Sequence, residues 1–179
     1  MGKRSDYPKK PRDYYPTPLE AVKPLVANLP TEFTYIEPCA GNSDLVNNIG
    51  KLTNGICLRQ YDIEPQNDFI IEFDALDLTE KETDKSDFII TNPPWTRTKQ
   101  SGYLMHELLE RFAVLKPTWL LLDADWPHTL QSSKYIEQYC VKIVSIGRVK
   151  WFGNTTGKDN CCWYLFDSNK TQSTIFIGR

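Results

Sequence analysis

The feature that most constrains this chain is a series of short apolar runs that alternate with segments of helical periodicity. The run Trp119-Leu120-Leu121-Leu122 has no polar position, which is typical of a parallel strand covered on both faces. Strands that alternate with helices predict an α/β domain with a mostly parallel sheet. We predict strands at 33–37, 56–62, 69–73, 87–92, 119–123, 141–149 and 161–167, with a peripheral eighth at 173–177.

Helices are predicted between these runs. Thr17-Pro18-Leu19-Glu20 supplies an N-cap residue, a proline in the first turn and an acid, so a helix begins there and ends before Pro30. Further helices are predicted from Ser43-Asp44 through Ile49, over 103–115 and over 129–139. Residues 16–179 are expected to form one domain, and residues 1–15 a flexible, basic, proline-rich arm.

Charge and length limit the classes of function. The 179 residues carry 21 Lys and Arg against 23 Asp and Glu, so the chain is not a basic protein that holds long duplex DNA by charge alone. No apolar run approaches the roughly 18 residues of a membrane span, and the charged N-terminus does not resemble a secretory signal. The five cysteines include no C-x-x-C pair. We expect a cytoplasmic protein without a membrane partner or a structural metal.

Three acidic motifs fall at the ends of predicted strands, where doubly wound sheets bind ligands. Glu37-Pro38-Cys39-Ala40-Gly41 is a small-residue turn before a helix, which lets a ligand approach the backbone. It lacks the glycines of the dinucleotide fingerprint, and Glu37 favours a cationic amine over a phosphate. Asp62 can accept hydrogen bonds from ribose hydroxyls or cap the next element. Asp74 can accept from an adenine amino group or cap a short helix.

A fourth motif, Asn92-Pro93-Pro94-Trp95, directly follows the apolar run at 88–91. Two successive prolines cannot donate to a sheet, so the strand ends here in a stiff loop. An asparagine oxygen and a proline carbonyl can accept both hydrogens of an amino group, which localises the lone pair of its nitrogen. Trp95 offers a face on which a planar base can stack. The alternative interpretation is a proline turn closed by an aromatic side chain.

These motifs resemble the class I S-adenosylmethionine-dependent methyltransferases, and within them the small phage-type N6-adenine DNA methyltransferases. Tyr14-Tyr15-Pro16-Thr17-Pro18 resembles an N-terminal cofactor motif of some of these enzymes. The resemblance implies a single Rossmann-like methyltransferase domain with a mostly parallel seven-stranded sheet and an antiparallel strand near the C-terminus. Asn92, Pro93, Pro94 and Trp95 are implied as catalytic residues. Tyr15, Thr17, Glu37, Pro38, Ala40, Gly41, Asp62, Ile63, Asp74, Ala75 and Asn92 are implied to bind S-adenosylmethionine. Trp95, Arg97, Asp125, Trp126, Lys150, Trp151 and Lys158 are implied to bind the substrate.

The activity implied by this resemblance is methyl transfer from S-adenosylmethionine to the N6 amino group of adenine in DNA. Because the predicted core uses nearly the whole chain, we expect a short or relaxed target sequence, or an accessory recognition partner or homodimer. One alternative is an RNA adenine or protein glutamine methyltransferase, since those families share an Asn-Pro-Pro-aromatic loop. Another is a non-catalytic methyltransferase-fold protein that binds or inhibits a partner. If a phage encodes the chain, its location would be the bacterial host cytoplasm.

Overall fold

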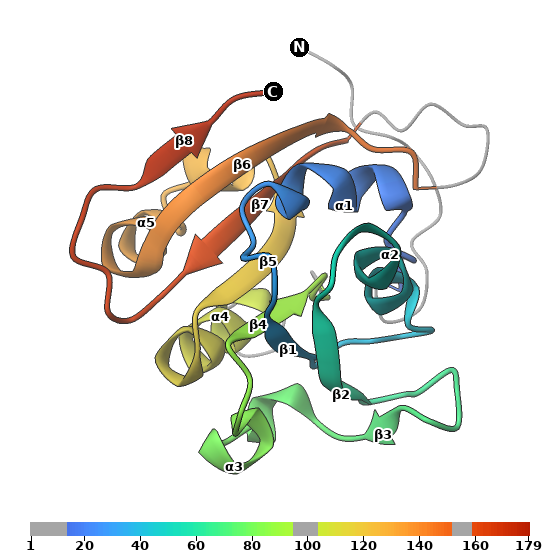
Figure 1. The fold of residues 1–179 in the computed structure, drawn as a ribbon. Helices are drawn as coiled ribbons and strands as arrows, with labels where there is room; N and C mark the ends of the chain where they lie inside the picture. Colours follow the sequence, from blue (N-terminus) through green and yellow to red (C-terminus); the bar gives the residue numbers. More distant parts are fainter. Residues whose placement is uncertain (1–13, 95–103, 152–158) are drawn as a thin grey trace.

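The computed structural model describes residues 14–94, 104–151 and 159–179, and these form an eight-stranded sheet (Figure 1). The strand order is β3-β2-β1-β4-β5-β7-β6-β8. β7 is antiparallel to both of its neighbours, and the other strand pairs are parallel. The strands are β1 (Thr34–Glu37), β2 (Ile56–Asp62), β3 (Ile71–Glu72), β4 (Phe88–Thr91), β5 (Thr118–Asp123), β6 (Cys140–Arg148), β7 (Asn160–Phe166) and β8 (Ile175–Ile177).

This topology confirms the predicted α/β fold with a mostly parallel sheet and one antiparallel strand near the C-terminus. The sheet has eight strands instead of seven, because β8 pairs in parallel with β6 at the edge. The short β8 was predicted only as a peripheral strand. Its pairing joins residues more than thirty positions apart in the chain, such as Lys142 and Ile175, which local sequence patterns do not specify.

Helices cover both faces of the sheet (Figure 1). Trp119 and Leu121 of β5 pack in the cluster that includes α1 and α2, whereas Leu120 and Leu122 pack in the cluster that includes α4 and α5. This two-sided burial explains the uninterrupted apolar run. None of the helices within the described residues is long and apolar enough to cross a membrane. The helices are α1 (Leu19–Val26), α2 (Asp44–Leu52), α3 (Glu80–Thr83), α4 (Leu104–Leu115) and α5 (Ser133–Tyr139), with short 3-10 helices η2 (Ala75–Asp77) and η3 (Trp126–His128).

The start of α1 differs from its prediction in a way that affects the site. Thr17 was expected to cap this helix, but Pro18 occupies the N-cap position and α1 has no side-chain cap. The hydroxyl of Thr17 is therefore available for a partner outside the helix.

The helix predicted at 129–139 is also shorter than expected, since α5 begins only at Ser133. Thr129 and Ser132 bond to each other through side chain and backbone, with Ser132 Oγ donating to the Thr129 carbonyl at 2.8 Å. Such local bonds of Ser and Thr compete with helix formation and hold this segment in a turn.

Candidate functional site

A pocket of about 340 Å³ lies at the carboxyl ends of β1, β2 and β4, the edge of the sheet at which open α/β folds bind ligands. Its volume falls in the range of roughly 300–1,000 Å³ that small-molecule sites occupy. It is lined by Tyr14, Tyr15, Pro16, Thr17, Glu37, Pro38, Cys39, Ala40, Gly41, Asn42, Asp44, Leu45, Asp62, Ile63, Glu64, Gln66, Asp74, Ala75, Asn92, Pro94, Leu104 and Leu108.

The structure brings together at this pocket every residue that was predicted to bind the cofactor. Of the predicted catalytic residues, Asn92 and Pro94 line the pocket and Pro93 between them is buried. Trp95 lies outside the described residues, as do residues 1–13 of the predicted arm. Sequence reasoning missed Asp44, Leu104 and Leu108 as pocket residues, because helix-start and core patterns explained them without a ligand. It also missed Gln66, an exposed loop residue that belongs to no recognisable motif.

The turn after β1 requires glycine at position 41. Gly41 has a φ of +54°, and a Cβ there would lie 2.6 Å from Cε2 of the Tyr14 ring. The Gly41 N–H donates to Asp62 Oδ2 at 2.7 Å, while Asp62 Oδ1 accepts from the Glu64 N–H at 2.8 Å. Asp62 thus ties the end of β2 to the turn. Each of its oxygens has a second lone pair with which to accept a ligand hydroxyl.

Glu37, the last residue of β1, places a buried carboxyl at the pocket. The side chain is 1% exposed, and its Oε2 has no hydrogen-bond partner among the described residues. Burial raises the pKa of Glu37 well above its usual range, and the nearby carboxylates of Asp62 and Asp44 raise it further, whereas a hydrogen bond from the Val46 backbone opposes the shift. A positively charged ligand in the pocket would stabilise the ionised form of this carboxyl.

The electrostatic character of the pocket is acidic. Carboxylates line it from several elements, and the lining residues include no Lys or Arg among those that the structure describes. Burial also raises the pKa of Asp44, in the first turn of α2, although Lys51 partly offsets the effect. These carboxylates disfavour a phosphate and favour a cationic ligand that also carries hydrogen-bond donors. The acidic lining residues are Glu37, Asp44, Asp62, Glu64 and Asp74.

Asp74 has the capping role that the sequence left open as an alternative. Its Oδ1 accepts from the Leu76 N–H at 2.9 Å and caps η2. The residue also lines the pocket. One carboxyl oxygen of Asp74 therefore caps η2, while the other is available to a ligand in the pocket.

Asn92 is held by the segment before α1. Its Nδ2 donates to the Tyr15 carbonyl and to Thr17 Oγ1, each at 3.2 Å. A carbonyl can only accept, so the nitrogen end of the amide must face Tyr15. Oδ1 lies at the other end of this planar group, which lines the pocket. The Asn92 amide can therefore offer an acceptor to an amino group.

The residues predicted to bind the substrate do not all lie at the pocket. Trp151 lies near the pocket, because its ring meets that of Tyr15 edge to face with centroids 6.3 Å apart. Lys150 and Asp125 are exposed and do not line the pocket. Arg97 and Lys158 lie outside the described residues.

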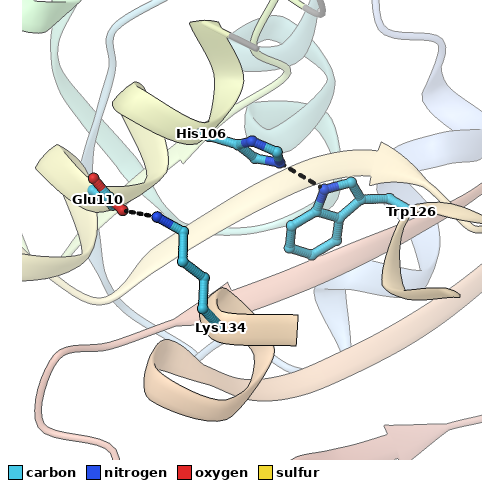
Figure 2. Close-up of polar contacts among 4 residues, drawn as sticks. All are labelled: His106, Glu110, Trp126 and Lys134. Carbon is cyan, nitrogen blue, oxygen red and sulfur yellow. Dashed lines mark hydrogen bonds and ion pairs between the residues drawn. The ribbon is translucent and has the colours of Figure 1, made fainter. Parts of the chain in front are cut away.

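Trp126, also predicted to bind the substrate, is buried in the core and is absent from the pocket lining. Its side chain is 5% exposed and its Nε1–H donates to His106 Nε2 at 3.0 Å (Figure 2). Tyr164 and Phe166 meet the indole edge to face, so Trp126 is a core residue that joins η3 to α4. Burial lowers the pKa of His106, and the neighbouring Lys134, which pairs with Glu110 at 3.0 Å, lowers it further. The Trp126 position after β5 was suggestive of a target loop, but its polar partner lies in the core.

No family model and no curated protein matches this sequence. Solved structures do. A candidate RNA methyltransferase from Pyrococcus horikoshii aligns over 92% of each chain with a TM-score of 0.62 and 14% identity. The type IIG restriction endonuclease BpuSI has a TM-score of 0.63 and 12% identity, over 88% of this chain and 26% of that one.

A candidate class I S-adenosylmethionine-dependent methyltransferase from Listeria monocytogenes aligns over 89% of this chain and 62% of its own, with a TM-score of 0.57 and 9% identity. At sequence identities this low, the similarity establishes the fold alone. The chain has the Rossmann-like fold of the class I S-adenosylmethionine-dependent methyltransferases.

Proposed function

We propose that this protein transfers a methyl group from S-adenosylmethionine to the N6 amino group of adenine in DNA. The observation that carries this proposal is the presence of Asn92 in the same pocket as Gly41 and Asp62. An acceptor suited to an exocyclic amino group thus borders a site suited to a ribose and a positive charge.

The residues of the pocket fit this cofactor. Asp62 would accept from the ribose hydroxyls, and the free oxygen of Asp74 from an amino donor of the adenine. Ile63 and Ala75 offer apolar surface to a planar ring. The buried Glu37 carboxyl, with an unpartnered oxygen among the described residues, would balance the positive charge. When bound, S-adenosylmethionine supplies a methyl group already activated by its sulfonium charge.

The chain itself contributes orientation and hydrogen-bond acceptors. Asn92 Oδ1 and the Pro93 carbonyl would accept the two N–H groups of the target amine, so that its lone pair is free to form the new N–C bond as the S–C bond breaks. The methylated nitrogen then loses one proton to water. Orientation of this kind lowers barriers by roughly 7–11 kcal/mol. Acceptors placed before the reaction add electrostatic stabilisation.

The target base would leave its stack at a cost of a few kcal/mol. Trp151, which is half-buried with its ring against that of Tyr15, would stack on the extruded base. Such stacking contributes about 1–3 kcal/mol per base. Lys150 next to it is exposed and can contact a backbone phosphate.

DNA is favoured over a protein glutamine because Trp follows the two prolines, where glutamine enzymes more often carry Tyr. RNA adenine is the nearest alternative, and the likeness to a candidate RNA methyltransferase makes it a necessary arm of the test. The short or relaxed target sequence expected above, and an accessory partner or homodimer, remain part of this proposal.

The test is transfer of labelled methyl groups to DNA, structured RNA and protein in parallel. We expect N6-methyladenine in DNA with the wild type and none with Asn92→Ala, while thermal stabilisation by S-adenosylmethionine persists in both. Label found in RNA or on protein glutamine instead would show that DNA is not the substrate. Cofactor binding without transfer to any substrate would favour the non-catalytic alternative.

A further inference from the structure

Thr17 lies just before a helix, but its hydroxyl does not cap that helix. The side chain is 4% exposed, and its hydroxyl accepts from Asn92 Nδ2 at 3.2 Å instead of capping α1. Pro18 at the N-cap moves the helix start one residue onward, which leaves Thr17 Oγ1 for Asn92. A cap typically contributes about 1 kcal/mol, so the helix forgoes a common source of stability here.

The segment that carries Thr17 is itself fixed. Its carbonyl accepts from Asn48 Nδ2 of α2 at 2.9 Å, a bond between buried residues. Ala21, in the first turn of α1, accepts from Trp163 Nε1 at 2.7 Å and so anchors the helix to β7. Pro16 and Pro18 on either side restrict the backbone. The two acceptors for Asn92 therefore belong to a rigid support.

We propose that Thr17, with the Tyr15 carbonyl, is a positioning residue that keeps the Asn92 amide turned so that Oδ1 and not NH2 meets the target amino group. The inference rests on the function proposed above. An asparagine amide rotated by half a turn would present N–H donors to an amino group that also donates, and the acceptor needed for transfer would be lost.

The kinetic test compares Thr17→Val, which keeps the shape and removes the acceptor, with Thr17→Ser, which keeps the acceptor. We expect kcat to fall about 3- to 10-fold in Thr17→Val, the effect of one neutral hydrogen bond. If Thr17 acts through the Asn92 amide, the KM for S-adenosylmethionine should change by less than about twofold; a larger rise would mean that the Thr17 hydroxyl contacts the cofactor directly and would overturn the positioning role. Thr17→Ser should restore kcat. An unchanged kcat in Thr17→Val, or a loss that Thr17→Ser does not restore, would overturn the proposal.

An activity-independent measurement separates this inference from the proposed function. In protein labelled with 15N at asparagine, the Asn92 side-chain signal is identified by its loss in Asn92→Ala. We expect its NH2 protons to exchange with solvent about tenfold faster in Thr17→Val than in the wild type or Thr17→Ser, because one acceptor is gone. Equal exchange rates would refute the positioning role even if activity fell. A wild type without methyl transfer would refute the proposed function, and the exchange rates would still decide whether Thr17 holds the amide.

Discussion

Glu37→Gln is expected to make the free protein more stable and cofactor binding weaker. Glutamine has the shape of a protonated glutamic acid and cannot ionise. In the wild type the carboxyl is buried, one oxygen lacks a partner among the described residues, and Asp62 and Asp44 lie close enough to raise its pKa. Ionised Glu37 is therefore a buried charge that the free protein compensates only in part, through the hydrogen bond from the Val46 backbone.

The sign of the effect depends on pH. The pKa of Glu37 is raised in the folded state above its unfolded value of about 4.3, so the protonated form stabilises the fold fully below that value. This contribution is lost as the pH rises through the folded-state pKa. The variant and the wild type should thus be equally stable near pH about 4, and the variant should become the more stable of the two at higher pH.

The size of the two effects follows from the contacts of the carboxyl. An uncompensated buried group of this kind costs about 1–3 kcal/mol, which corresponds to a melting temperature higher by roughly 2–12 °C for a chain of this length. Loss of a charged hydrogen bond to a cationic ligand of about 1.5–3 kcal/mol weakens binding roughly 10- to 150-fold.

Thermal unfolding of both proteins across a range of pH, with and without S-adenosylmethionine, measures both effects. Asp74→Asn is a matched control, because that carboxyl is exposed and its loss should leave the stability of the free protein nearly unchanged. A Glu37→Gln protein that is less stable than the wild type at pH about 8, or a difference that does not depend on pH, would refute the reasoning.

The remaining predictions concern the turn and the core. Asp62→Ala should abolish thermal stabilisation by S-adenosylmethionine, since it removes the partner of the Gly41 N–H and the acceptor proposed for the ribose; an undiminished shift would contradict this. Trp126→Phe should lower the free energy of unfolding in urea by about 1–3 kcal/mol, because it removes the buried hydrogen bond from the indole N–H to His106 Nε2; a cost below about 0.5 kcal/mol would disagree. The pKa of His106 is lowered in the folded state, so stability is complete above its unfolded pKa of about 6.5 and falls as the pH drops through the folded value. His106→Gln should flatten this acid dependence, and an unaltered pH profile would count against it.

The parallel core was predictable from the sequence because burial on two faces leaves a local signal. The four apolar residues of β5 point alternately into two clusters, and any polar residue among them would interrupt one cluster. The edge strands were less predictable. Only Ile71 and Glu72 remain of the strand predicted at 69–73, and edge pairing depends on distant partners rather than on the segment itself.

Side-chain partners across the fold were beyond local patterns. Thr17 and Pro18 together satisfied the rules for a helix start, yet the hydroxyl serves Asn92, which is 75 residues away in the chain. Trp126 lies just after the end of β5, a position typical of binding residues, but its indole N–H donates to His106 in the core. In both cases the residue type indicated that its polar group would form a hydrogen bond, but only the tertiary structure identified the partner.

The charge of the pocket decides between ligands that the fold alone leaves open. The crevice of a Rossmann-like sheet usually receives a pyrophosphate at the first helix N-terminus, where free N–H groups favour an anion. Here Asp44 occupies the first turn of α2, and Glu37 ends the strand before it. An anion at that place would meet two carboxylates, whereas a sulfonium or an ammonium group would relieve their repulsion. These two side chains thus favour a cationic ligand over an anion, and in the proposed function Asn92 at the neighbouring strand end would hold the amino group of the target beside that ligand.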